Sequence, residues 1–389
     1  MSDTPKRVTI RDVADQAGIS FQTVSLVLNH PEKVAPKTLA HVRAVIDALG
    51  FVPSMAARSL RQIRTRTLAC IFFGQRASYD NRSFQVQDTY WNNVLQMLSR
   101  AADSQGYALL QRHQGQDEQA LAQVRQMFLA GRIDGIVAVV ERSDNPLLRA
   151  LQREGVPLVV YGTRDPALPY VAQTNETASA QVVDHLHAAG CRRIAFIAGE
   201  RDGHVNDDVS ERLRGYRRAM ASHGLAVNPA WQLAGDWSLA SGHRIAQQLC
   251  AREDGPDALI FASDRMALGA LKGLHDIGRR VPLDVSVVGF DNMQYDDYSI
   301  PPLTSVHSPV LDMANTAIQI LIDQIEATPA NRPAPAQHMF DTRLVVREST
   351  AQLPAVQPTA QTTGRAMAKP ARAARRPQGA TSSTKRDRA

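Results

Sequence analysis

The first fifty residues carry three short amphipathic patterns, each with a recognisable beginning or end. Apolar residues recur there at the i, i+3, i+4, i+7 spacing of a helix with one buried face. Thr9 and Ser20 are placed to cap the first two helices, Gly18 to end the first, and Pro36 to open the third. The expected helices span residues 10–17, 21–29 and 36–49.

The short turn between the first two helices contains a glycine, which is typical of a helix-turn-helix unit. The second helix of such a unit fits the major groove of DNA, about 12 Å wide. In this helix Phe21, Gln22 and Ser25 are expected on the face opposite Val24 and Leu28. The Gln22 amide donates and accepts together, which suits adenine, and Phe21 suits a thymine methyl or a sugar.

From about residue 67 to residue 347, short apolar runs alternate with amphipathic helical stretches. Strands separated by helices of roughly 10 to 15 residues predict parallel sheets with right-handed crossovers. The series occurs twice, which predicts a pair of doubly wound halves. The expected strands span residues 67–73, 107–110, 136–140, 158–161, 194–197, 259–261 and 286–290.

Charge is distributed unevenly along the 389 residues. The net charge is +5 up to Arg66, −6 from Thr67 to Thr350 and +7 from Ala351 to the end. Because attraction to phosphate follows local charge, polyanion binding is expected at the two ends and not on the acidic middle.

Other features narrow the class of protein. No apolar run approaches the roughly 20 residues of a membrane span, and the polar start resembles no secretory signal, so a cytoplasmic protein is expected. Cys70, Cys191 and Cys250 are too far apart for a zinc knuckle and are expected in the core. The chain contains none of the common nucleotide-binding, hydrolase or metalloprotease motifs. We therefore expect no enzyme activity, no cofactor and no metal.

The opening segment contains a motif in four parts, Thr9-Ile10-Arg11-Asp12-Val13-Ala14, Ala17-Gly18-Ile19-Ser20, Thr23-Val24-Ser25 and Leu49-Gly50-Phe51-Val52-Pro53. With this motif the segment resembles the LacI (lactose repressor) family of bacterial transcription regulators. The resemblance implies an all-α helix-turn-helix domain at residues 1–53. It also implies an α/β core of two doubly wound parallel-sheet subdomains, similar to periplasmic sugar-binding proteins.

The resemblance assigns DNA-contacting positions. Phe21, Gln22 and Leu26 fall at the positions that contact bases, although relatives frequently carry arginine where this chain has Leu26. Leu26 then either packs on a thymine methyl or covers the core of the domain. A further set of polar residues at helix starts and turns either contacts phosphates or only caps helices: Thr9, Ser20, Thr23, Ser25, Asn29, Lys33 and Thr38.

Residues 54–66 match the family's hinge segment, which folds as a helix on DNA and inserts a leucine into the minor groove. Leu60 matches that leucine, and Ala57 and Arg58 belong to the same segment. An apolar wedge of this kind kinks DNA by unstacking a base step. The alternative is a basic linker that never becomes ordered.

The implied effector-binding domain covers residues 67–350, and its chain crosses between the subdomains three times around a central cleft. We expect one subdomain at 67–174 with 306–335 and the other at 175–305 with 336–350. The tail, 351–389, is rich in Ala, Pro, Gln, Thr and Arg and is expected to be disordered. It either strengthens non-specific DNA binding or is dispensable.

Ligands of parallel sheets bind beyond the carboxyl ends of the strands. Arg212 and Asp291 match the family's ligand-binding arginine and aspartate, a pair that suits a polyol or a sugar acid. Ser263 and Asp264 occupy one strand-to-helix turn, where Asp264 serves either the ligand or the helix cap. Trp237 either stacks its ring against a sugar or packs in the core.

The facing side of the cleft is expected to include Trp91, at the end of a long loop, and Tyr161. Tyr161 replaces an aspartate that several sugar-binding relatives carry, so the ligand stays undefined. The expected whole is a dimer that binds an inverted-repeat operator on double-stranded DNA. A small molecule, a sugar or sugar acid, would change its affinity through one conformational equilibrium, by induction or by co-repression.

Overall fold

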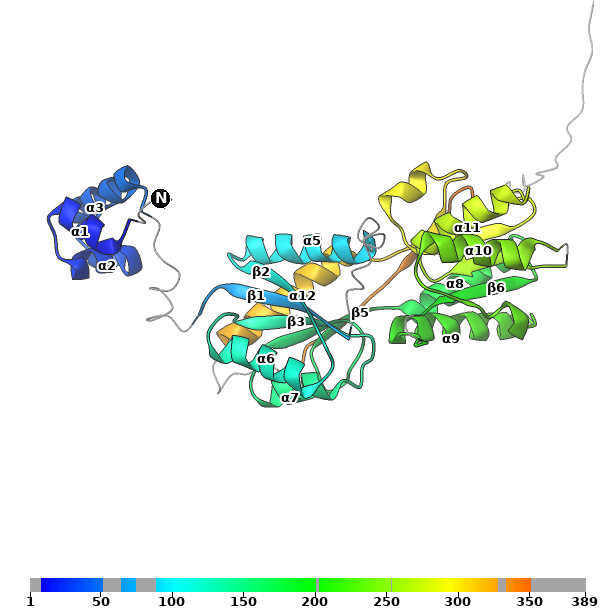
Figure 1. Ribbon diagram of the computed structural model, residues 1–389, viewed down its shortest axis with the longest axis horizontal. Coiled ribbons are helices and arrows are strands. Elements are labelled where there is room, and N and C mark those ends of the chain that lie inside the picture. Colours follow the sequence, from blue (N-terminus) through cyan, green and yellow to red (C-terminus); the bar gives the residue numbers. More distant parts are fainter. Residues whose placement is uncertain are drawn as a thin grey trace, which may run out of the picture. The chain divides into compact units, whose positions relative to one another are not determined.

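The computed structural model describes residues 8–51, 64–74, 89–200, 203–252, 254–327 and 334–350. The first range is a three-helix unit (Figure 1). Its core is built from the apolar positions that the sequence predicts, with Val13, Val24 and Val42 fully buried. The elements are α1 (Ile10–Ala17), α2 (Phe21–Asn29), the 3-10 helix η1 (Pro31–Lys33) and α3 (Pro36–Leu49).

The helix boundaries of this unit follow the predicted signals. The Thr9 hydroxyl accepts from the backbone N–H of Asp12, whose carboxylate in turn accepts from the Thr9 N–H, a complete capping box. Ser20 accepts from the N–H of Thr23. Gly18 ends α1 with φ 65°, a left-handed conformation that favours glycine.

The first of two six-stranded sheets has the order β11-β5-β4-β3-β1-β2, with all its strand pairs parallel. Side chains of β1 alternate between two buried clusters, Leu68, Cys70 and Phe72 on one face and Ala69 and Ile71 on the other. Both faces are therefore covered, as a parallel sheet requires. Helices α5 and α12 pack on the first face and α6 and α7 on the second (Figure 1).

The strands of this sheet are β1 (Thr67–Phe73), β2 (Ala108–Gln114), β3 (Gly135–Val139), β4 (Leu158–Gly162), β5 (Tyr170–Gln173) and β11 (Gln337–Phe340). Its helices are α5 (Thr89–Ser104), α6 (Glu118–Leu129), α7 (Pro146–Arg153) and α12 (Val310–Glu326).

The second sheet has the order β12-β10-β9-β8-β6-β7, and its strands are parallel except for the antiparallel β12. Its strands are β6 (Ile194–Gly199), β7 (Ala234–Gly235), β8 (Ala258–Phe261), β9 (Ser286–Asp291), β10 (Thr304–His307) and β12 (Arg343–Val345). The accompanying helices are α8 (Asn175–Ala188), α9 (Asp207–Ser222), α10 (Leu239–Cys250) and α11 (Asp264–Asp276), with η3 (Pro229–Trp231) and η4 (Gln294–Tyr298).

Glycines permit close helix packing in this subdomain. A Cβ on Gly242 of α10 would lie 1.9 Å from the carbonyl oxygen of Met266, and one on Gly269 of α11 would lie 1.9 Å from that of Leu239. Likewise, a Cβ on Gly215 of α9 would lie 2.0 Å from the carbonyl oxygen of Glu176 in α8. The two helix pairs therefore approach backbone to backbone, which positions α9 against the second sheet.

Two expected boundaries between the subdomains are wrong. Residues 306 and 307 belong to β10 of the second sheet, and residues 337–340 form β11 of the first. The chain thus returns to the first sheet after β10, through α12 and β11, and then crosses back to β12. The signal was weak because β11 and β12 are short and partly exposed, without the apolar run of a central strand.

Within the described ranges, no helix is both long and apolar enough to cross a membrane. Cys70, Cys191 and Cys250 are buried free thiols, as the sequence predicts. Residues 54–63 of the predicted hinge segment 54–66, and the whole tail 351–389, lie outside the described residues.

Candidate DNA-reading helix and effector pocket

Helix α2 presents three large side chains outward. Phe21 is 45% exposed and Leu26 is 37% exposed, and Gln22 is exposed beside them. Leu26 lies outside the apolar cluster of the three-helix unit, so the alternative that it covers this core is wrong. The outward face of α2 therefore combines one amide with two apolar groups.

Ser25 does not share that face. It is 7% exposed and lies beside the buried Val24 in α2, so its expected outward placement is wrong. A serine at this position fits because its side chain is small. Among the other expected phosphate contacts, Thr9 and Ser20 cap their helices and remain exposed, and Lys33 is exposed at the end of η1.

The three-helix unit, residues 8–51, carries no net charge. Between Val8 and Phe51 four basic residues are balanced by four acidic ones. The next fifteen residues, 52–66, contain four arginines and no acid. Positive charge is therefore concentrated in this segment, and its predicted DNA contacts Ala57, Arg58 and Leu60 lie outside the described residues.

A pocket that is open to solvent lies between the carboxyl ends of the two sheets. Six of the seven predicted effector residues line it: Trp91, Tyr161, Arg212, Trp237, Ser263 and Asp291. They come from both subdomains, as the strand-end argument predicts.

Arg212 is the buried cation of the pocket, with 5% of its surface exposed. Its Nε donates to Asn175 Oδ1 at 2.8 Å, its Nη1 donates to the carbonyl of Ala262 at 2.8 Å, and its guanidinium lies 4.3 Å from the centre of the Phe290 ring. These contacts fix the plane of the fork. Within the described residues no hydrogen bond involves Nη2, so this nitrogen can donate to an acceptor of a ligand.

Asp208 lies one helical turn before Arg212 on α9 and also lines the pocket. The Asn175 amide joins the two, because its Nδ2 donates to Asp208 Oδ1 at 3.0 Å while its oxygen accepts from Arg212. Burial raises the pKa of the Asp208 carboxyl to about 6, and the Arg212 guanidinium opposes part of that shift. At neutral pH this pair places opposite charges on one wall of the pocket.

Two further lining residues adopt strained backbone conformations. Trp237 has φ 66° and Asp291 has φ 118°, in the region that non-glycine residues rarely occupy. Strain of this kind persists where the surrounding structure fixes a functional side chain. The indole of Trp237 lies across Gly199, because a Cβ there would be 2.3 Å from its Cζ2. Trp237 both packs on the core of the subdomain and lines the pocket.

Three buried polar atoms around the pocket have no hydrogen-bond partner among the described residues. They are the Tyr161 hydroxyl, the Thr163 hydroxyl and Arg265 Nε. Burial raises the pKa of Tyr161 well above its ordinary value, so the phenol stays protonated and acts as a donor. Buried polar groups are normally hydrogen-bonded, so these atoms indicate a polar ligand. Trp91 adds an aromatic edge 6.4 Å from the ring centre of Tyr161.

Asp264 does not line the pocket, so its expected contact with the ligand is wrong. Its carboxylate is fully buried and accepts from Ser305 Oγ at 2.5 Å and from the Met293 N–H at 3.1 Å. Burial and the neighbouring Asp296 carboxyl raise its pKa well above the ordinary value. The cap of α11 is Ser263, which accepts from the N–H of Met266.

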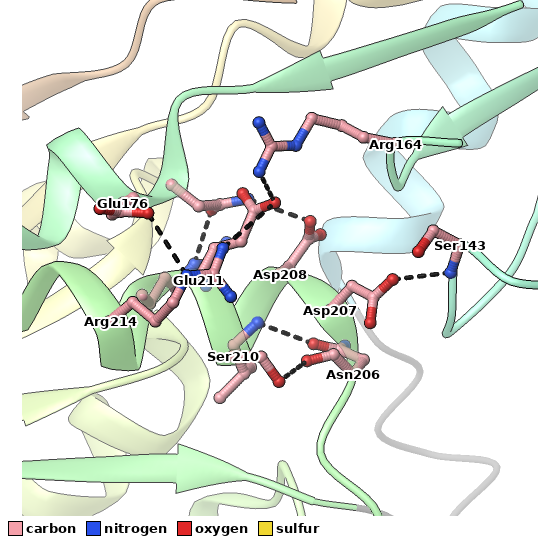
Figure 2. Close-up of polar contacts among 12 residues, drawn as sticks. Ser143, Arg164, Glu176, Asn206, Asp207, Asp208, Ser210, Glu211 and Arg214 are labelled. Atoms are coloured by element: carbon pink, nitrogen blue, oxygen red, sulfur yellow. Dashed lines mark hydrogen bonds and ion pairs between the residues drawn. The ribbon is translucent and has the colours of Figure 1, made fainter. Parts of the chain in front are cut away.

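The first turns of α9 also contact the opposite subdomain (Figure 2). Asp207 Oδ2 accepts from the Ser143 N–H at 2.6 Å, and its own N–H donates to the carbonyl of Glu141 at 3.0 Å. Arg164 forms an ion pair with Glu211. Residues 207 and 211 therefore bridge the subdomains, while Asp208 and Arg212, their immediate neighbours, face the pocket.

The sequence interpretation missed Asp208 and Asn175. A local signal was present for each, because Asp208 lies four residues before Arg212 on one helix face and Asn175 lies two residues after the end of β5. Residues 75–88 of the long loop before Trp91 lie outside the described residues.

The three-helix head and the two-subdomain core together define a DNA-binding transcription regulator with a periplasmic-binding-protein-like core. Residues 9–54 match the family model described as bacterial regulatory proteins, lacI family, and residues 183–350 match the periplasmic binding protein-like domain. The chain belongs to the LacI family of bacterial transcription regulators.

Several relatives support this assignment. The HTH-type transcriptional regulator CelR of Thermobifida fusca is 34% identical over 352 residues, covering 88% of this chain and 98% of CelR. The HTH-type transcriptional repressor PurR of Aliivibrio fischeri (strain MJ11) is 31% identical over 323 residues, covering 82% of this chain and 92% of PurR.

Solved structures show the same architecture. A CelR–cellobiose complex matches with a TM-score of 0.62 and 31% identity, covering 88% of this chain and 100% of that chain. The lac repressor bound to ONPG in the repressed state matches with a TM-score of 0.73 and 25% identity, covering 89% and 100%.

The raised pKa of Asp208 predicts a pH-dependent cost to folding. Below about pH 4 the carboxyl is protonated in the folded and the unfolded chain. Between about pH 4 and pH 6 the unfolded chain releases this proton while the folded chain retains it, so stability is lost as the pH rises through this window and stays lower above it. The melting temperature of Asp208→Asn, which does not ionise, minus that of the wild type should be higher at pH 8 than at pH 5.

Thermal unfolding of both proteins at the two pH values measures this difference. Asp312→Asn, on an exposed position of α12, controls for the loss of one carboxylate. If the two melting temperatures differ by the same amount at pH 5 and at pH 8, the raised pKa of Asp208 is contradicted.

Proposed function

We propose that this chain is a repressor that binds a palindromic operator as a homodimer, and that an uncharged saccharide in the pocket controls its affinity for DNA. The observation that carries the effector part is the buried Arg212, held in place by Asn175 and balanced by Asp208. Its remaining nitrogen and the Asp291 carboxyl offer a donor and an acceptor to adjacent hydroxyls.

The charges of the pocket favour a neutral ligand over a sugar acid. Its lining includes the carboxyls of Glu141, Asp208 and Asp291 against the guanidinium groups of Arg212 and Arg265. A bound carboxylate would meet an excess of negative charge at low dielectric. The Trp237 and Trp91 rings supply apolar faces of the kind on which a pyranose ring stacks, which supports a sugar rather than a small inorganic ion.

The contacts of α9 support coupling between this pocket and the arrangement of the subdomains. A ligand that contacts Asp208 or Arg212 acts on the same helical turn whose Asp207 and Glu211 contact the other subdomain. Binding therefore favours one relative arrangement of the two sheets. Since both sheets belong to a core joined to the DNA-reading unit, effector and operator share one equilibrium.

Two exposed apolar residues support the dimer. Tyr298, the last residue of η4, is 78% exposed, and Ile300, two residues later, is 92% exposed. Exposed apolar side chains that lie close together are more typical of an interface than one that stands alone. The expected partner is a second copy of the chain, because a palindromic operator has two-fold symmetry and a homodimer has the same symmetry.

Gln22→Ala should weaken binding to a selected palindromic duplex by about 5- to 100-fold, the effect of losing one bidentate base contact. Binding to random DNA should change little, because phosphate contacts remain. Fluorescence anisotropy measures both affinities, with Gln16→Ala on the exposed face of α1 as the control. Equal losses on both duplexes would contradict base reading by Gln22.

The number of phosphate contacts has a separate readout. If about eight phosphates are contacted, log K should fall with log[salt] at a slope of about −7 in the wild type and in both variants.

A thermal-shift screen tests the effector class. Cellobiose or another neutral saccharide at about 100 times its Kd should raise the melting temperature by about 5 °C or more, from roughly 2.7 kcal/mol of linkage. Glucuronate and gluconate should give no shift. Arg212→Met should abolish the response, while Arg214→Met, an exposed neighbour outside the pocket lining, should keep it. A shift with the acids alone would contradict a neutral effector.

Sedimentation velocity tests the proposed dimer interface at Ile300. Ile300→Lys should convert the protein to monomers at low micromolar concentration in sedimentation velocity, because a charge replaces apolar contact area. Leu283→Lys, at a site 76% exposed elsewhere on the same subdomain, should leave the dimer intact. An unchanged sedimentation coefficient for Ile300→Lys would place the interface elsewhere.

A further inference from the structure

A single buried carboxylate holds the residues that lead into the effector-binding core. Thr65 and Arg66 stand directly before β1, and Asp134 stands directly before β3. The two strands are parallel neighbours, with Leu68 paired to Gly135. Their amino-terminal ends therefore lie side by side, and Asp134 is 7% exposed between them.

The carboxylate oxygens and the backbone N–H of Asp134 form hydrogen bonds with residues 65–67. Oδ1 accepts from the Thr65 N–H at 2.8 Å and from the Thr65 hydroxyl at 3.1 Å, and Oδ2 accepts from the Arg66 N–H at 2.6 Å. Its own N–H donates to the carbonyl of Thr67 at 2.7 Å. One residue thus binds three successive residues of the chain by four hydrogen bonds, three of them to an ionised acceptor.

The segment bends where it is held. Arg66 has φ 51°, a left-handed conformation that residues other than glycine rarely adopt. Its guanidinium lies 5.9 Å from the centre of the Tyr107 ring, and its carbonyl accepts from the Ala108 N–H at 2.9 Å. Arg64 donates to the carbonyl of Ile325 at 2.7 Å, at the end of α12. The bend therefore depends on contacts that the core provides.

The strand that follows Asp134 ends in the effector pocket. Val139, Val140 and Glu141 at the end of β3 line that pocket. From residue 134 to residue 140 an extended chain spans about 20 Å at 3.3 Å per residue. All five residues of β3 are buried, so this strand is a rigid connection between the pocket and the entry of the chain.

We propose that Asp134 is a positioning residue that fixes where the DNA-binding unit is joined to the core and transmits the state of the pocket to it. The regulatory part of this proposal rests on the proposed function above. A carboxyl group fits this position because both of its oxygens accept hydrogen bonds from the segment. Asparagine keeps the shape but replaces one acceptor oxygen by a donor.

The experiment compares Asp134→Asn with Asp165→Asn in the full chain. Asp165 is a matched control in the same subdomain: it is 1% exposed and accepts from Arg149 Nε and from the Ala167 N–H, both at 2.9 Å. Hydrogen exchange with mass spectrometry reports on peptides covering residues 64–68. Asp134→Asn should accelerate exchange there at least tenfold, and Asp165→Asn should not.

The second readout is coupling to DNA. With cellobiose, or the neutral saccharide that gives a thermal shift, Asp134→Asn should bind the ligand within twofold of wild type. Its effector-induced change in operator affinity should fall at least fivefold. Unchanged exchange at 64–68, or an equal loss of coupling in Asp165→Asn, would overturn the proposal. A wild-type chain that responds to no saccharide would instead refute the proposed function, while the exchange measurement would still decide whether Asp134 anchors this segment.

Discussion

The pocket depends on keeping one guanidinium out of water. Arg212 is almost fully buried, and a cation at that depth is stable only when acceptors and negative charge surround it. Here they come from separate parts of the second subdomain: the Asn175 amide after β5, the Ala262 carbonyl after β8 and the Phe290 ring of β9. Satisfying this one group therefore brings several loops into a fixed arrangement, and the neighbouring Asp208 completes the charge balance on the same wall.

The same helix gives the pocket its connection to the rest of the molecule. Along α9, Asp208 and Arg212 line the pocket while Asp207 and Glu211 contact the first subdomain. In that subdomain, β3 runs from the pocket back to Asp134. We infer that a change at the ligand is carried by rigid elements with buried polar contacts at both ends. No flexible pathway is required, since each step is a helix turn or a buried strand.

Local signals predicted what depends on local chemistry. Caps at Thr9 and Ser20, and the alternation of the buried strands, follow from residue type and spacing and are confirmed. Most predicted pocket residues also lie at strand ends as expected. The burial of Ser25 depends on how α2 packs within its unit, and the partners of Asp264 come from residues 29 and 41 positions away. Contacts between such distant residues leave no periodic signal, which is also why the exchange of β10 and β11 between sheets was missed.

The central claim is that one equilibrium links the pocket to DNA, and linkage makes this reciprocal. The most direct measurement is calorimetric titration of the identified saccharide into the free protein and into the protein saturated with its operator. The two effector affinities should differ by the same factor by which the effector changes operator affinity. Equal effector affinities in the presence and absence of operator DNA would contradict the account.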